Sequence, residues 1–246
     1  MKRSSLFSLL IAIVLLCVWE LACRAFNVPD FILPTPSQIL KAAVFKAAVL
    51  LPNAGITALE ILIGILISLV VSVPLSIAMF AHPSVENALA PFLVASQAVP
   101  VFAIAPLLVV WLGYGIASKV LMAAVIIFFP ITVNLLEGFK SCDLEYRNLF
   151  RLMGAGFWKT LHLLYWPWAL PHFFAGLKVG VSVATIGAVI GEWVGAQQGL
   201  GYLMIQANAR LNVDMVFAAI LWLSGMGLSL WILVGFLERK VINWKS

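Results

Sequence analysis

The sequence has little charge and few cysteines. Charged residues make up 10% of its 246 positions, whereas soluble domains carry about 25%, and 63% of its residues are hydrophobic. This composition excludes an ordinary soluble domain and indicates a membrane protein, whose length suits one domain of several helices. The three cysteines, Cys17, Cys23 and Cys142, lack the spacing of metal ligands, so we interpret them as small apolar side chains.

Motifs for catalysis are also absent from the sequence. It contains no G-x-x-x-x-G-K-[ST] phosphate-binding loop, no H-E-x-x-H pair and no recognisable Ser/His/Asp arrangement. We therefore predict no catalytic residue, no metal site and no cofactor in this chain. The 15 Lys and Arg residues are scattered, without the basic run that would indicate a nucleic-acid partner.

Long apolar runs are what the sequence does contain. A helix needs about 20 apolar residues to cross the hydrocarbon core of a bilayer, and these runs do not alternate as barrel strands do. The first run could belong to a signal peptide, but without a clear cleavage site we interpret it as a retained helix. We predict an all-α polytopic membrane protein with about six transmembrane helices: Leu6–Phe26, Ala54–Ala81, Ala88–Leu112, Lys119–Leu136, Phe173–Val194 and Val213–Leu237.

The basic residues predict the orientation of these spans. With six spans and the N-terminus inside, ten of the 15 Lys and Arg residues fall on the inner side. Because cytoplasmic loops carry the excess of basic residues, we expect both termini in the cytoplasm. The inner set is Lys2, Arg3, Lys140, Arg147, Arg151, Lys159, Lys178, Arg239, Lys240 and Lys245.

One segment is too polar to lie in lipid. Residues 136–170 hold seven of the 25 charged residues and fall on the predicted inner side. We expect two short helices here, Asp143–Met153 ending at Gly154, and Phe157–Trp166 ending at Pro167. The segment is either an amphipathic hairpin on the membrane surface or a surface offered to a cytoplasmic partner, and the residues alone favour neither.

This segment is similar to the cytoplasmic loop of permeases from binding-protein-dependent ABC importers. Gly154 and Ala155 stand at the glycine of that family's Glu-Ala-Ala-x-x-x-Gly pattern, and Ala169-Leu170-Pro171 lies near its downstream Leu-Pro. The family's Glu-Ala-Ala falls on Asn148-Leu149-Phe150, which differs at all three positions. Two further stretches, Ile32–Ser37 and Gly191–Met204, resemble elements of permeases for nitrate, sulfonate and taurine and for pyrimidine or thiamine precursors.

The resemblance implies a type I ABC importer permease fold in the bacterial inner membrane. Residues 1–53 would form the first helix and an outer connecting segment, and residues 54–246 a five-helix core with a coupling loop at 137–171. The implied partners are cytoplasmic ATPase subunits that bind ATP and Mg, an extracytoplasmic solute-binding protein, a second permease copy and membrane lipid. Contact with the ATPase would fall to Asn148, Leu149, Phe150, Arg151, Leu152, Met153, Gly154 and Ala155.

The resemblance also implies a small organic solute, first a pyrimidine or thiamine precursor, then a sulfonate, taurine or nitrate. An ion-coupled secondary transporter is the alternative, although the sequence shows no convincing internal repeat and few charges within its spans. A membrane enzyme is a third possibility, without a visible catalytic constellation. Prolines within the second and third predicted spans suit either a moving pathway or a static bundle: Pro74, Pro91, Pro100 and Pro106.

Ionisable and polar residues near the span ends are candidates for the solute pathway. Glu192 ends the fifth predicted span, and it either borders the pathway or lies at the outer boundary, in water or paired with Arg210. Gln197, Gln198 and Asn208 are expected to line the outer end of the pathway.

Two other carboxylates have simpler interpretations. Glu60 opens the second predicted span and is expected to face the outer surface. Glu20 and Arg24 are four residues apart and are expected to pair on one helix face.

Overall fold

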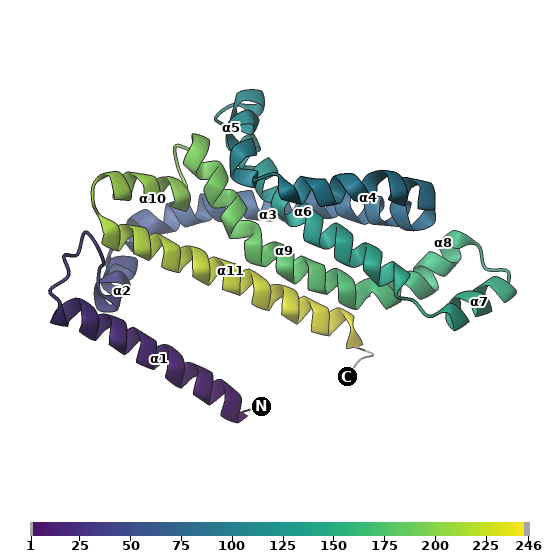
Figure 1. The fold of residues 1–246 in the computed structure, drawn as a ribbon, viewed down its shortest axis with the longest axis horizontal. Coiled ribbons are helices and arrows are strands. Elements are labelled where there is room, and N and C mark those ends of the chain that lie inside the picture. Colours follow the sequence, from purple (N-terminus) through teal and green to yellow (C-terminus); the bar gives the residue numbers. More distant parts are fainter. Residues whose placement is uncertain (1, 244–246) are drawn as a thin grey trace.

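The protein is an elongated bundle of helices (Figure 1). The structure, a computed structural model, describes the backbone of residues 2–243 and the side chains of residue 7 and residues 10–243, so Lys245 of the predicted inner set lies outside it. Within this range every regular element is helical, as predicted. The elements are α1 (Lys2–Ala25), α2 (Pro36–Phe45), α3 (Ala47–Ala81), α4 (Pro83–Ala98), α5 (Val101–Leu112), α6 (Ile116–Lys140), α7 (Leu144–Leu152), α8 (Phe157–Thr160), the π-helix η1 (Leu161–Tyr165), α9 (Trp166–Gly195), α10 (Leu200–Ala209) and α11 (Val213–Val241).

The number of spans is close to the predicted six. In the described part of the chain four helical stretches are long and apolar enough to cross a membrane, namely α3, α6, the continuous α8–η1–α9 and α11. The pair α4 and α5 is a fifth candidate if its two helices together make one span. α1 has 24 residues, about 36 Å of helix, which is the length that a sixth span needs.

The third predicted span, Ala88–Leu112, is not one straight helix. α4 and α5 meet at an angle of 100°, across Val99 and Pro100. Pro100 has no N–H to continue the helix, and its ring disfavours a helical backbone at the residue before it. Val99 is accordingly extended, with φ −80° and ψ 121°.

Three serines on one face of α3 fix it against α6. Ser68 donates a hydrogen bond to the carbonyl oxygen of Ala124 (2.7 Å), Ser76 donates to that of Thr132 (3.1 Å), and Ser72 makes the same contact between them. Each acceptor lies 56 residues after its serine. α3 and α6 therefore run in the same direction, so the chain must return between them through α4 and α5.

α6 and α9 pack closely because glycines line the α9 side of their interface. A Cβ on Gly176 would lie 2.6 Å from the carbonyl oxygen of Pro130, and one on Gly191 would lie 3.0 Å from the Cα of Lys119. Small residues of this kind let membrane helices approach until their backbones touch. The glycine stripe therefore sets the distance between the two central helices.

The helix that contains α9 is longer than predicted. It runs without a break from Phe157 to Gly195, 39 residues or about 58 Å, so a second loop helix ending at Pro167 and a fifth span beginning at Phe173 are both wrong. Pro167 removes one helical hydrogen bond and crowds the carbonyl of the preceding turn. The wider π-turn η1 lies just before Pro167 and accommodates it, as π-bulges do within α-helices.

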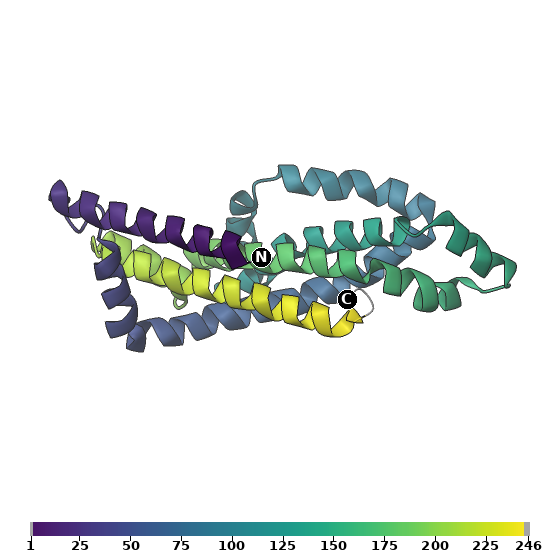
Figure 2. The same cartoon turned by 90° about the horizontal axis from the view of Figure 1, so that it is seen from below.

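The end of the bundle opposite α7 is closed by α2 and α10. Ala42 of α2, Leu50 of α3, Leu200 of α10 and Ala218 of α11 belong to one buried cluster. The predicted boundary between residues 53 and 54 falls inside α3, and the division into two domains stays a prediction. Figure 2 shows the first residues of α1 and the last residues of α11 on the α7 side of α2 and α10.

Candidate functional site

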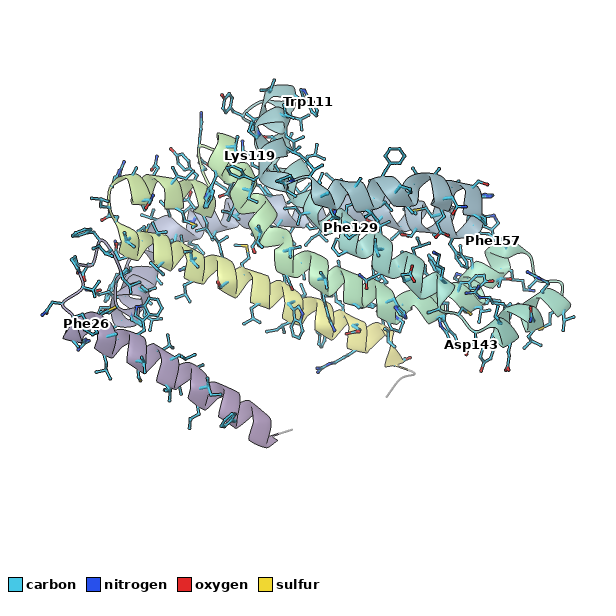
Figure 3. The ribbon with its side chains drawn as sticks, in the orientation of Figure 1. Phe26, Trp111, Lys119, Phe129, Asp143 and Phe157 are labelled. Carbon is cyan, nitrogen blue, oxygen red and sulfur yellow. The ribbon has the colours of Figure 1, made fainter. Side chains whose placement is uncertain are left out.

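α7 lies at one tip of the molecule. It is joined to α6 and α8 by two short links, and Asp143 and Phe157 mark the two ends of the segment in Figure 3. None of its nine residues is buried. Large apolar side chains are nevertheless exposed on α7 and its links, and Leu152 is 87% accessible. The same holds for Leu144, Tyr146 and Leu149 of α7, for Met153 after it, and for Phe157 and Trp158 at the start of α8. A group of exposed apolar side chains such as this one is typical of a surface that contacts another protein.

Gly154 ends α7 in the way the sequence predicts. Its φ is +70°, a left-handed conformation that glycine adopts without steric cost. The N–H of Gly154 donates to the carbonyl of Arg151, and the N–H of Ala155 donates to that of Phe150, both at 3.0 Å. These two bonds form a Schellman motif, which satisfies the last carbonyls of the helix and turns the chain toward α8.

Arg147 attaches α7 to the body of the protein. Its Nη2 donates to the carbonyl oxygens of Phe139 (3.1 Å) and Lys140 (2.5 Å), which lie in the last turn of α6. The guanidinium also lies over the rings of Phe80 and Tyr165, 5.9 and 5.6 Å from their centroids. A cation is favoured at a helix C-terminus, where carbonyls lack partners within the helix. One side chain thus links α7 to α3, α6 and η1.

An aromatic cluster surrounds this attachment point. Phe80 of α3 contacts Phe139 of α6 and Tyr165 of η1, and Phe139 contacts Trp166 of α9. Phe139 is fully buried. Aromatic rings packed in this way give a close contact area that deforms little. The α7 segment is therefore fixed to three long helices at once.

The structure brings the eight predicted coupling residues together on one segment. Phe150 and Ala155 are half-buried beneath it and the other six are exposed; their role in coupling stays a prediction. Sequence reasoning missed Arg147 as a positioning residue. The available signal was an arginine seven residues after the end of a long helix at Lys140, where unpaired carbonyls attract a cation.

Two of the three cysteines fit their interpretation as small apolar side chains. Cys23 and Cys142 are buried, whereas Cys17 is exposed on α1. Burial raises the pKa of the Cys142 thiol, more than the neighbouring Arg147 lowers it. A thiol of this kind stays protonated at neutral pH and is a poor nucleophile.

Glu192 lies at the other end of α9 and is only 1% exposed. Its carboxylate accepts hydrogen bonds from Thr57 Oγ1 (2.6 Å) and from the backbone N–H groups of Gly201 (2.5 Å) and Tyr202 (3.3 Å). It thereby satisfies free N–H groups in the first turn of α10. These partners and the burial of Glu192 exclude the alternative of a side chain in water or paired with Arg210, and a role in the pathway stays a prediction.

Lys119 is also buried in this region, at 2% exposed (Figure 3). Its Nζ donates to the carbonyl oxygens of Tyr114 (2.6 Å), Gly115 (2.9 Å) and Gly195 (2.5 Å). These three bonds use all three ammonium hydrogens and tie the end of α9 to the start of α6.

Glu60 completes this cluster. The expectation that it faces the outer surface is wrong, since the side chain is 3% exposed and lies beside the carboxyl of Glu192. It lines a cavity of about 310 Å³ whose wall includes Gln197 and Gln198. Both glutamines are exposed, whereas Asn208 is exposed on α10 and is not part of that wall.

The expected pair Glu20 and Arg24 is confirmed, at 2.5 Å. Glu20 also accepts from the backbone N–H and the hydroxyl of Ser37 at 3.0 and 2.8 Å, which connects α1 to the start of α2. The role of these two residues is structural.

A larger cavity of about 630 Å³ lies where α4 bends into α5. Its wall is mostly apolar, with side chains from α4, α5, α6 and α9, and it includes Gln97, Val99, Phe129 and Asn134. The broken third span thus borders an open space between helices. The sequence contains prolines here, which indicate a possible break in the helix, but it gave no sign of the cavity.

Comparisons with known proteins agree with these features. The binding-protein-dependent transport system inner membrane component family matches residues 60–243. A probable ABC transporter permease of Haemophilus influenzae is 40% identical, with 98% of this chain and 99% of that protein covered. The formylaminopyrimidine transport permease ThiX of Halalkalibacterium halodurans is 38% identical, with 100% and 99% covered. The taurine transport system permease TauC of Escherichia coli is 29% identical, with 94% and 86% covered.

Proposed function

The chain belongs to the binding-protein-dependent transport system inner membrane component family, and from this premise we propose that the solute it imports is a pyrimidine or thiamine precursor. Membership in this family makes the chain a multi-pass ABC importer permease for a small solute, rather than an ion-coupled carrier or a membrane enzyme. The observation that carries the choice of solute is whole-chain identity. It is 38% to a formylaminopyrimidine permease and 36% to a riboflavin permease, against 29% to a taurine permease and 26% to a sulfonate permease.

The proposed mechanism uses a separate ATPase, which holds ATP and Mg and binds the exposed face of α7 in the cytoplasm. A solute-binding protein delivers the solute to the opposite end of the bundle, and a second copy of the chain completes the pore. The apolar side chains of α7 support this assignment, because a surface of this kind is buried when a partner binds. Both chain ends then lie on the cytoplasmic side.

The contacts of α7 support a rigid-body mechanism. When the ATPase subunits close, they displace α7, and Arg147 and the aromatic rings beneath it carry that displacement to α3, α6 and α9. Packed helices respond to such a displacement by shifting together, since their interiors deform little. The continuous helix from Phe157 to Gly195 extends the movement to the Glu192 cluster.

Replacing an exposed side chain of α7 tests the contact with the ATPase. Leu152→Ser should weaken that contact by about 1–2 kcal/mol, roughly five- to thirty-fold, without disturbing the fold. The measurement is the amount of ATPase that co-purifies with the permease. Leu40→Ser is the matched control, because Leu40 is also a leucine and is 58% exposed, on α2 at the other end. Equal ATPase recovery from the two variants would contradict the proposed contact.

Uptake of labelled solutes tests the choice of solute. Cells that express the chain together with its binding protein and its ATPase should take up formylaminopyrimidine. They should not take up taurine or nitrate. The sulfonate group is the second candidate, supported by the taurine and sulfonate relatives. Uptake of taurine without uptake of formylaminopyrimidine would overturn the proposed solute and leave the permease assignment intact.

A further inference from the structure

Two buried carboxyl groups lie side by side at the end of the bundle that is opposite α7. The carboxyl of Glu60 is hydrogen-bonded to that of Glu192, and the two residues are 3% and 1% exposed. Neither forms an ion pair with a basic side chain in the described part of the chain. Two negative charges buried in contact repel each other strongly, so a pair in which both carboxyls are ionised is disfavoured.

The surroundings of the two carboxyls differ. Glu192 accepts from the hydroxyl of Thr57 at 2.6 Å and from the backbone N–H groups of Gly201 and Tyr202 at 2.5 and 3.3 Å. Donors of this kind stabilise the ionised form of a carboxyl. Glu60 has a buried Oε2 that receives no donor from the described residues. An oxygen in that position costs less to bury in a neutral carboxylic acid than in a carboxylate.

We propose that Glu60 carries a proton, donates it in a hydrogen bond to the Glu192 carboxylate, and thereby positions α10 at the outer end of the importer. The charges nearby agree with a single ionised carboxyl. The ammonium of Lys119, held by three backbone carbonyl oxygens, offsets the one negative charge that remains. The inference does not depend on the solute, and only the assignment of this end to the outside rests on the proposed function.

Glu192 can position α10 because side chains supply the acceptors at the start of that helix. The N–H groups of Gly199 and Leu200 donate to Asn53 Oδ1 (2.8 Å) and Thr57 Oγ1 (2.9 Å) of α3, and the next two N–H groups donate to Glu192. A Cβ on Gly199 would lie 2.3 Å from the Cδ of Glu192, so the carboxyl is seated directly against this backbone. The start of α10 therefore rests on side chains of α3 and α9.

The hydrogen bond between Glu60 and Glu192 joins these two supports. The continuous helix from Phe157 to Gly195 ends at this cluster, so a displacement of α9 relative to α3 pulls directly on that bond. A pair that shares one proton holds the two helices together, whereas an ionised pair would push them apart. The shared proton thus acts as a latch between α3, α9 and α10.

Infrared spectra of the full chain test for the proton directly. Exposed carboxyl groups are ionised at neutral pH, so Glu60→Gln should remove the C=O stretching band of a protonated carboxylic acid. Glu86→Gln is the matched control, because Glu86 forms an ion pair with Lys140 near α7 and should not contribute to that band. The shared proton is overturned if the unsubstituted chain lacks the band or if the band persists in Glu60→Gln.

Hydrogen exchange of the backbone N–H groups in residues 199–209 tests the positioning of α10. Glu60→Met occupies similar space without a donor, and it should speed this exchange at least about tenfold through the loss of a hydrogen bond to a charged group. Glu60→Gln keeps an N–H donor for Glu192, so exchange should stay within about threefold of that in the unsubstituted chain. Equal exchange in the Met and Gln variants would show that Glu60 only fills space.

A change of pH gives the same test if Glu60→Met does not fold. At the alkaline pH where the infrared band disappears, the unsubstituted chain should exchange faster than Glu60→Gln, because the lost proton leaves two charges in contact. Glu192, Lys119 and Tyr114 are the other titratable groups near Glu60. They are present in both proteins, so their own titration cancels in the comparison. Equal exchange at that pH would overturn the positioning role.

Discussion

Arg147 shows how a single side chain fixes the position of a whole helix. α7 buries none of its residues completely, and its apolar contacts with the bundle are few, among them Tyr146 against the ring of Trp168 in α9. The arginine places its guanidinium over two adjoining rings and donates to two carbonyls at the end of α6. Lysine would keep the charge but lose the planar guanidinium that lies over both rings.

At the residue scale we predict that Arg147→Ala releases α7 from the bundle. Each hydrogen bond from a charged donor contributes about 1.5–3 kcal/mol, so the loss of both should raise the population of the detached segment at least about a hundred-fold. Limited chymotrypsin digestion of the purified protein measures this population through cleavage within residues 144–158. Arg147→Lys should give an intermediate rate.

Arg151→Ala is the control for this measurement. Arg151 lies one turn later on the same helix and is exposed, so its loss should leave the cleavage rate within about twofold. Equal rates for the Arg147 and Arg151 variants would show that something other than Arg147 holds α7.

At the element scale the decisive contact is the one between α6 and α9. Gly176→Ala should destabilise it, because the new Cβ would lie 2.6 Å from the carbonyl oxygen of Pro130, a backbone atom that cannot move alone. Overpacking of this kind costs about 1–3 kcal/mol. Thermal unfolding in detergent should show a lower midpoint than that of the unsubstituted protein.

Gly225→Ala provides the matched control on α11, where a Cβ would meet nothing within 4 Å. Alanine is favoured over glycine in a helix by about 1 kcal/mol, so this variant should be as stable as the original protein or more so. If both alanine variants unfold at the same temperature, the glycine stripe does not set the helix spacing.

Two prolines show how far the sequence predicts the elements. Pro100 breaks its helix: the residue before it, Val99, is extended, and a cavity lies beside the bend. Pro167 is equally unable to donate, yet its helix continues, because a π-turn precedes it and aromatic contacts hold both sides in line. Both prolines lack an N–H group to donate. Whether the helix breaks or continues therefore depends on the residues that pack around each proline.

At the scale of the whole molecule, the arrangement predicts opposite accessibility at its two ends. In a variant without its native cysteines, Phe26→Cys should react with a membrane-impermeant maleimide. The reagent is added to cells whose outer membrane is permeable and whose inner membrane is intact. Trp158→Cys should react only after the inner membrane is opened. The two positions are 81% and 73% exposed, so both thiols can react once the reagent reaches them. Labelling of Trp158→Cys from outside would reverse the proposed orientation.

The sequence by itself determined the helical membrane class, the family resemblance, and the α7 segment with its terminating glycine. Continuous apolar runs and a glycine that ends a helix depend on neighbouring residues alone, so the sequence is enough to predict them. Only the tertiary structure decided that Glu60 and Glu192 lie side by side, that Lys119 is saturated by carbonyls, and that Arg147 reaches the end of α6. These contacts depend on which helices run in the same direction and how closely they approach. That follows from packing summed over the whole bundle, because no single helix can bury its polar groups alone.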